Sequence, residues 1–153
     1  MQTEVLLTPI LETERREFLA MAQTYFSELN PGFSPRDDWK ANYFEAIQGN
    51  SDCRLCWIVS EGNKAGFVLF GFERHRFLPR KNGAVYELYV RPEHRRRGIA
   101  RASAQRAIAE LKSAGPSRIQ LEVAAGNSGA TAFWTSLGFE KVAERYVLAS
   151  EDR

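Results

Sequence analysis

The sequence predicts a mixed α/β (α+β) fold, with a central twisted sheet of six to seven strands flanked by about four helices. First, apolar residues recur at strand and helix spacing in the order β-α-α-β-β-β-α-β-α-β, with the last strand single or double. Second, the strand–helix–strand unit at 84–124 should be a right-handed crossover with parallel strands. Third, 153 residues with 44% hydrophobic and 26% charged content suit one globular domain, so we expect a single domain over residues 1–153.

The first third of the chain is predicted to hold one strand and two helices. TEVLLTPI (3–10) reads as a strand, and apolar residues at helical spacing predict a helix from about Thr13 to Leu29. The Asn-Pro-Gly stretch at 30–32 should end it. Ser34 is a suitable N-cap with Pro35 at the first position of a second helix, which should end near residue 49.

The rest of the chain is predicted to alternate strands with helices. EGNK has the composition of a hairpin turn between two of these strands. The expected strands are 53–60, 65–73, 82–90, 118–124 and one or two within 139–150; the expected helices run from Gly98 to about Ser113 and from about Ser128 to Leu137.

Composition narrows the class of protein. The net charge of +2 does not indicate a nucleic-acid partner, and no apolar run reaches the ~20 residues of a membrane helix. The first residues carry no pattern of a secretory signal, so we expect a cytoplasmic protein with no membrane partner. Cys53 and Cys56 form a CxxC pair, but three residues apart on a strand they point to opposite faces. We therefore expect no metal site.

The segment RPEHRRRGIAR (91–101) holds five arginines around Gly98, between a predicted strand and a predicted helix. A helix start offers unpaired N–H groups and partial positive charge, and glycine lets an oxygen approach the backbone. These features suit a small ligand with more than one phosphate. Neither the Walker A pattern nor GxGxxG occurs, which argues against those phosphate loops. A solvated or nucleic-acid-facing charged surface is the alternative.

Two motifs carry a resemblance to a known family. RRRGIA (95–100) matches the R/Q-x-x-G-x-G/A signature of the GNAT family of N-acetyltransferases, and YELYV (86–90) looks like the strand before that loop. NSGATAFWTSLGFE (127–140) resembles the family's N-x-x-A-x-x-F-Y-x-x-x-G-F segment. The resemblance implies an enzyme that moves an acetyl group from acetyl-CoA to a primary amine of a small molecule, peptide or protein by direct attack.

The resemblance also implies which residues bind the co-substrate acetyl-CoA. The pantetheine arm would run along the main chain of a strand, and the pyrophosphate would lie on the arginine–glycine loop. The residues implied are Leu88, Tyr89, Val90, Arg95, Arg96, Arg97, Gly98, Ile99, Ala100, Arg101, Asn127 and Phe133. Asn127 could equally be a helix N-cap, and Phe133 could be a core residue.

The predicted chemistry needs a base, because an aliphatic amine is protonated at neutral pH. Glu87 is the first candidate: it lies in an apolar strand, on the face expected to carry Val85 and Tyr89, where burial would raise its pKa. A structural carboxylate paired with an Arg or Tyr is the alternative role, and Glu122 is the next candidate base.

One departure from the family pattern bears on the leaving group. Trp134 stands where many relatives carry a tyrosine acid, and indole is not a proton source at neutral pH. The thiolate would leave unassisted, or Tyr89 or Tyr146 would protonate it. A non-catalytic acyl-CoA-binding regulatory domain of the same fold is therefore the alternative function.

The acceptor amine is not specified by the sequence. Asp37 and Asp38 beside Trp39, Tyr43 and Phe44 would suit a cation with an apolar body, although helix capping and core packing explain the same residues. Self-association as a homodimer is left open.

Overall fold

The structure is a computed structural model that describes residues 3–150. The chain divides into two compact units, Met1–Leu121 and Glu122–Arg153, and each is described by itself. The expectation of a single domain over residues 1–153 stays a prediction. Within the described residues, no helix combines the length and the apolar character needed to cross a bilayer.

The first unit contains one five-stranded sheet in the order β1-β2-β3-β4-β5. The first four strands are antiparallel neighbours, and β5 runs parallel to β4. The mixed sheet predicted from the sequence is therefore confirmed. The strands are β1 (Leu6–Pro9), β2 (Cys53–Ser60), β3 (Asn63–Arg74), β4 (Lys81–Val90) and β5 (Ile119–Gln120).

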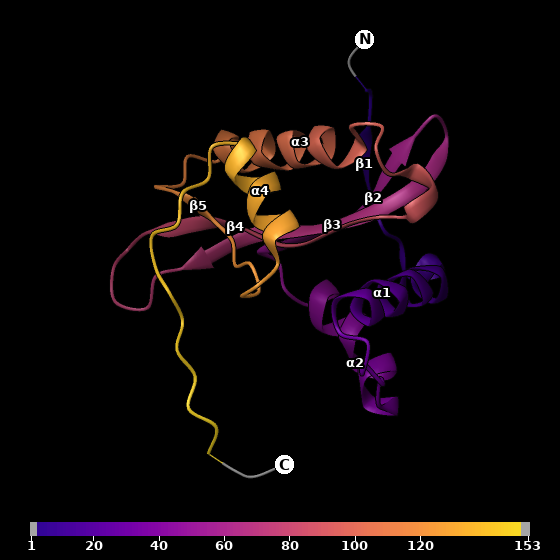
Figure 1. Cartoon of the computed structure of the whole chain (residues 1–153), viewed down its shortest axis with the longest axis horizontal. Helices are drawn as coiled ribbons and strands as arrows, with labels where there is room; N and C mark the ends of the chain where they lie inside the picture. Colours follow the sequence, from indigo (N-terminus) through magenta and orange to yellow (C-terminus); the bar gives the residue numbers. More distant parts are fainter. Residues whose placement is uncertain (1–2, 151–153) are drawn as a thin grey trace. The chain divides into compact units, whose positions relative to one another are not determined.

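Helices cover both faces of this sheet (Figure 1). The helices α1 (Arg15–Leu29) and α2 (Asp37–Gln48) lie on one face, and α3 (Ile99–Ser113) lies on the other. Short 3-10 turns, η1 (Glu12–Glu14) and η2 (Pro92–His94), precede α1 and α3. The prediction that α2 begins after Ser34 is wrong. Its N-cap is Arg36, whose extended backbone delays the helix until the acidic Asp37 and Asp38 of the first turn.

The core between the sheet and the pair α1 and α2 is aromatic. The rings of Phe18, Phe44, Trp57 and Phe67 are almost fully buried, and Phe18 meets the edge of Phe67 at 5.1 Å between centroids. Leu69 of β3 and Tyr89 of β4 belong to the same cluster, which shows that both side chains face α1 and α2. Burial of such large rings is the main stabilising contribution at this face.

A β-bulge in β4 changes which side chains share a face. Glu87 pairs with Leu69 whereas Val85 pairs with Phe70, so Tyr86 is an extra residue in the strand. Residues paired across a sheet point the same way, and consecutive residues of β3 point opposite ways. Glu87 therefore faces α1 and α2 with Tyr89, but Val85 faces the opposite side. The prediction that Val85 shares the face of Glu87 is wrong because strict alternation fails at a bulge.

The sheet is smaller than the six to seven strands predicted. Only Ile119 and Gln120 pair with β4, opposite Gly83 and Ala84, instead of a strand over 118–124. The bulge follows directly in β4, and a bulge bends its strand away from a neighbour.

Among the described residues of the second unit, 122–150, the one helix is α4 (Ser128–Ser136), close to the predicted 128–137. Residues 139–150 form no strand. Their charged side chains make local contacts, such as Lys141 with Glu144, and a strand exists only where a neighbouring strand accepts its hydrogen bonds.

Candidate active site

The turn before α3 has the backbone geometry that an anion site requires. Gly98 is the N-cap of α3 with φ +76°, and Arg96 also has a positive φ of 63°. Alternating handedness of this kind turns successive N–H groups toward one concavity. Among the described residues, none accepts a hydrogen bond from the backbone N–H groups of residues 96–100. The loop therefore presents unsatisfied donors beside the positive end of the helix macrodipole.

The side chain of Arg95 is directed toward β4 and α1. Its Nε donates to the carbonyl of Val90 at 2.8 Å, and its Nη2 bonds to Glu28 of α1 at 2.7 Å. The guanidinium also lies 5.7 Å from the centroid of the Tyr89 ring. Arg95 thus joins the end of β4 to α1, whereas Arg96 and Arg97 are exposed at the turn.

The strand that leads into this turn has an unpaired edge. In the described chain, β5 pairs with β4 only as far as Ala84, so residues 85–90 have no strand partner on that side. The opposite edge pairs closely with β3. A Cβ added to Gly66 would lie 1.8 Å from the carbonyl oxygen of Tyr89, so this position requires glycine. Leu88, Tyr89 and Val90 are therefore held from one side only.

Glu87 is half-buried and meets two tyrosines from the facing helices. The hydroxyl of Tyr25, on α1, donates a hydrogen bond to Glu87 Oε2. Burial raises the pKa of the Glu87 carboxyl above its ordinary value, and the Tyr25 hydrogen bond opposes that rise. Burial and the charge of Glu87 raise the pKa values of both Tyr25 and Tyr43. Both phenols therefore stay protonated at neutral pH.

The alternative base is placed differently. Glu122 lies outside any strand, is exposed, and forms an ion pair with Arg145 within the second unit. The prediction that it lies on a strand beside Glu87 is wrong because β5 ends at Gln120. Burial is what makes a carboxylate a useful base, and Glu122 is not buried.

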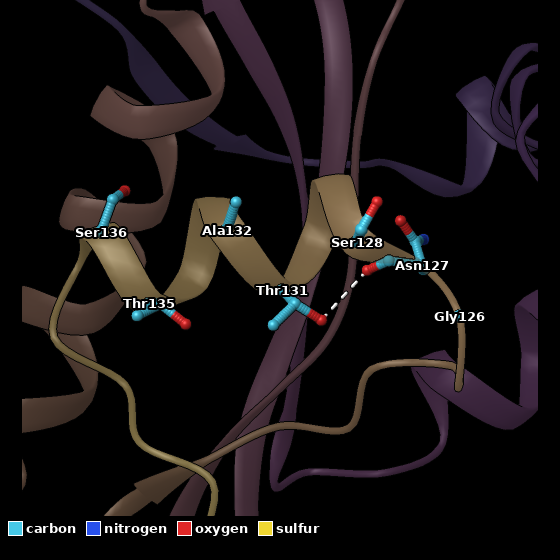
Figure 2. Close-up of a pocket in the computed structure, with 7 residues that line it drawn as sticks. All are labelled: Gly126, Asn127, Ser128, Thr131, Ala132, Thr135 and Ser136. Carbon is cyan, nitrogen blue, oxygen red and sulfur yellow. Dashed lines mark hydrogen bonds between the residues drawn. The ribbon is translucent and has the colours of Figure 1, made fainter.

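Asn127 begins α4 and lines an open pocket with small and hydroxyl-bearing residues of that helix (Figure 2). Its side-chain oxygen accepts a hydrogen bond from the N–H of Ala130 at 3.0 Å, and its carbonyl accepts from the Thr131 hydroxyl at 3.0 Å. Asn127 is thus an N-cap, as the sequence allowed. The cap uses only the oxygen of the amide, which leaves its nitrogen compatible with the predicted contact to the co-substrate.

Aromatic rings gather at the other end of α4. Trp134 contacts Phe133 at 4.9 Å and Phe139 at 5.4 Å between centroids, so Phe133 is part of a local ring cluster. The hydroxyl of Tyr146 donates to Glu144 at 2.8 Å. All of these contacts join residues of the second unit.

The predicted acceptor segment contributes mostly to packing. Trp39 and Tyr43 stack at 5.1 Å, Phe44 is fully buried, and Asp37 and Asp38 lie in the exposed first turn of α2. Sequence reasoning missed Tyr25 as a site residue, because helical spacing marks it only as a member of the buried face of α1. Within residues 3–150, no three His, Cys, Asp or Glu side chains gather to hold a metal.

A mixed sheet whose fourth strand runs into a glycine-capped helix is the architecture of a class of acetyltransferases. The solved ribosomal-protein-alanine N-acetyltransferase of Brucella melitensis biovar Abortus 2308 has this fold: TM-score 0.73, 19% identity, covering 97% of this chain and 99% of that one.

The chain belongs to the acetyltransferase (GNAT) family, whose model matches residues 15–139. It is 36% identical over 107 residues to the ribosomal protein bS18-alanine N-acetyltransferase of Escherichia coli K12, covering 70% of this chain and 68% of the relative. An uncharacterized N-acetyltransferase of Methanocaldococcus jannaschii is 25% identical over 126 residues. That match covers 82% of this chain but only 56% of the relative's length.

Proposed function

We propose that this protein is an N-acetyltransferase that moves the acetyl group of acetyl-CoA to a primary amine of a peptide or protein. The observation that carries the proposal is the continuity of β4, with its unpaired edge, and the turn at residues 91–98, with its unsatisfied N–H groups. Membership of the GNAT family supports the same conclusion.

In this proposal the co-substrate extends the sheet. The pantetheine amides bond to the main chain of Leu88 and Val90, as a further strand would, because the main-chain groups of Tyr89 point toward β3. The pyrophosphate accepts hydrogen bonds from the N–H groups of residues 96–100, and the charges of Arg96, Arg97 and Arg101 neutralise it. Arg95 supports this region by holding the carbonyl of Val90. Asn127 and Phe133, in the second unit, stay predicted contacts of the co-substrate.

The reaction is direct attack of the amine on the thioester. Glu87 accepts a proton from the acceptor ammonium, which frees the nitrogen lone pair to form a bond with the acetyl carbon. A backbone N–H near Val90 donates to the oxyanion of the tetrahedral intermediate. The C–S bond then breaks and coenzyme A leaves as a thiolate. The proton that the attacking nitrogen still carries is released as the amide forms and passes through water to the thiolate. The indole of Trp134 supplies no proton.

The class of acceptor rests on the relatives. The Escherichia coli relative, by its name, acts on alanine of a ribosomal protein, which favours a peptide or protein amine over a small-molecule amine. The alternative function, a non-catalytic acyl-CoA-binding regulatory domain, predicts binding without turnover. Cytoplasmic location and a homodimer stay predictions.

A panel of amines assayed with acetyl-CoA by release of the free thiol tests the proposal. The panel contains peptides with different N-terminal residues, the same peptides blocked at the α-amine, a lysine-containing blocked peptide, a polyamine and an aminoglycoside. We expect turnover with free peptide amines and none with fully blocked peptides. Tight binding of acetyl-CoA without turnover on any amine would instead support the regulatory domain.

A further inference from the structure

Glu87 is a half-buried carboxylate whose recorded partner is a neutral group. Its contact is with Tyr25, which lies 62 residues earlier in the chain. In residues 3–150, no Lys, Arg or His nitrogen lies within 4.0 Å of it. Other carboxylates on this side of the sheet are paired with cations, as Glu14 and Glu17 are with Lys64 at 2.7 Å. A desolvated carboxylate without a countercharge is costly unless a ligand supplies one.

The groups that face Glu87 come from both helices and from its own strand. Tyr25 of α1 bonds to Glu87 directly, and the charge of Glu87 contributes to the raised pKa of Tyr43 on α2. On β4, the ring of Tyr89 lies 5.4 Å from that of Tyr25, and Arg95 with its partner Glu28 lies beyond that ring. The surroundings of the carboxylate are thus aromatic and uncharged, which suits a primary ammonium.

We propose that Tyr25 is the positioning residue of this site: its phenol holds one oxygen of Glu87 and leaves the other to receive the ammonium of the acceptor. The inference rests on the proposed function. Tyr25 keeps its proton throughout, because burial and the charge of Glu87 raise its pKa. One ammonium proton passes to Glu87, and the freed lone pair forms the new bond to the acetyl carbon. Tyr25 therefore acts through Glu87 and not on the substrate.

The hydrogen bond has a consequence for pH dependence. The phenol stabilises the ionised carboxylate against the burial that disfavours it, so its removal raises the pKa of Glu87 further. The acidic limb of the kcat/KM profile, where Glu87 loses its proton, should move to higher pH. On that limb we expect kcat/KM to fall by roughly tenfold, the lower end of what a hydrogen bond to a charged group contributes.

The test compares Tyr25→Phe with Tyr86→Phe in the full chain. Both remove one hydroxyl, and Tyr86 adjoins Glu87 in the strand, but burial and the charge of Glu73, not that of Glu87, raise its pKa. The phenylalanine at position 25 keeps the ring that packs on Phe67 at 5.5 Å, so both variants should fold. Only Tyr25→Phe should displace the acidic limb, and in a Glu87→Gln background it should have no further effect on kcat. Equal profiles for the two single variants would overturn the proposal.

A direct titration separates this inference from the proposed function. The side-chain carboxyl of Glu87 is followed by ¹³C NMR across pH in wild type, Tyr25→Phe and Tyr86→Phe, without any substrate. We expect the Glu87 titration to move upward in Tyr25→Phe alone. An unchanged titration in that variant refutes the role of Tyr25 whatever the enzyme acetylates. If no amine is acetylated by wild type, the proposed function fails while this measurement still decides the hydrogen bond.

Discussion

At the scale of single residues, Glu87 is the group on which the proposed chemistry depends. Glu87→Gln keeps the shape of the side chain and can still accept the hydrogen bond of Tyr25, but it cannot take up a proton at neutral pH. We expect kcat to fall by about 10²–10⁴-fold, the usual contribution of a general base, with little change in acetyl-CoA affinity. Steady-state kinetics and a binding titration measure both. A rate within about threefold of wild type would assign Glu87 a structural role.

The same substitution makes a prediction about stability. The folded-state pKa of Glu87 lies above its ordinary value, so the ionised carboxylate destabilises the native state. The contribution of Glu87 to stability is therefore lost as pH rises through that pKa, and Glu87→Gln lacks this loss. The difference in unfolding free energy, Glu87→Gln minus wild type, should therefore be larger at pH 7 than at pH 4. Urea unfolding at both values checks this, and a pH-independent difference would contradict it.

Gly98 is the second residue with a specific requirement. An alanine there must adopt a left-handed conformation, which costs about 1–2 kcal/mol, and places its Cβ 3.2 Å from the Thr3 hydroxyl oxygen. Gly115, with φ +73° and no atom within 4 Å of an added Cβ, is a matched control. Both alanine variants should lose similar stability, but only Gly98→Ala should weaken acetyl-CoA binding, by roughly tenfold or more. Equal affinities would remove the turn from the site.

At the scale of elements, the contact between β3 and β4 holds the strand along which the pantetheine is proposed to lie. Gly66→Ala cannot be accommodated without displacing the Tyr89 carbonyl. We expect a loss of roughly 1–3 kcal/mol of unfolding free energy, as for other overpacked sites, and weaker acetyl-CoA binding. Gly32→Ala is the control, because its Cβ would meet its nearest neighbour at an ordinary 3.5 Å. Melting curves and binding titrations of both variants test this.

Elements also differ in how far local sequence predicts them. The β2–β3 hairpin turns within EGNK, as its composition predicts, with positive φ values at Glu61 and Gly62. The bulge at Tyr86 leaves no comparable signal, because an extra residue in one strand is defined only by its pairing with the next. The start of α2 also differs from the prediction, because Ser34 and Pro35 are acceptable in a loop as well as at a helix start.

At the scale of the whole molecule, acetyl-CoA should stabilise the fold. A ligand that binds only the native state at 100 times its dissociation constant adds about 2.7 kcal/mol to the unfolding free energy, so the Tm should rise by several degrees. Coenzyme A should give most of the same shift because it keeps the phosphates. Differential scanning fluorimetry measures both, and an unchanged Tm at millimolar acetyl-CoA would contradict the binding proposal.

The sequence by itself determined the features that depend on a few neighbouring residues. Periodicity predicted α1, α3 and α4, and the strand–glycine–helix order predicted the turn at Gly98, whose left-handed backbone the structure adds. The tertiary structure decided the features that depend on distant partners: the side chain of Arg95 bonds to Glu28, 67 residues earlier, and Glu87 bonds to Tyr25. Local conformation follows from propensities within a turn or two, whereas the environment of a buried charge depends on which elements pack against it.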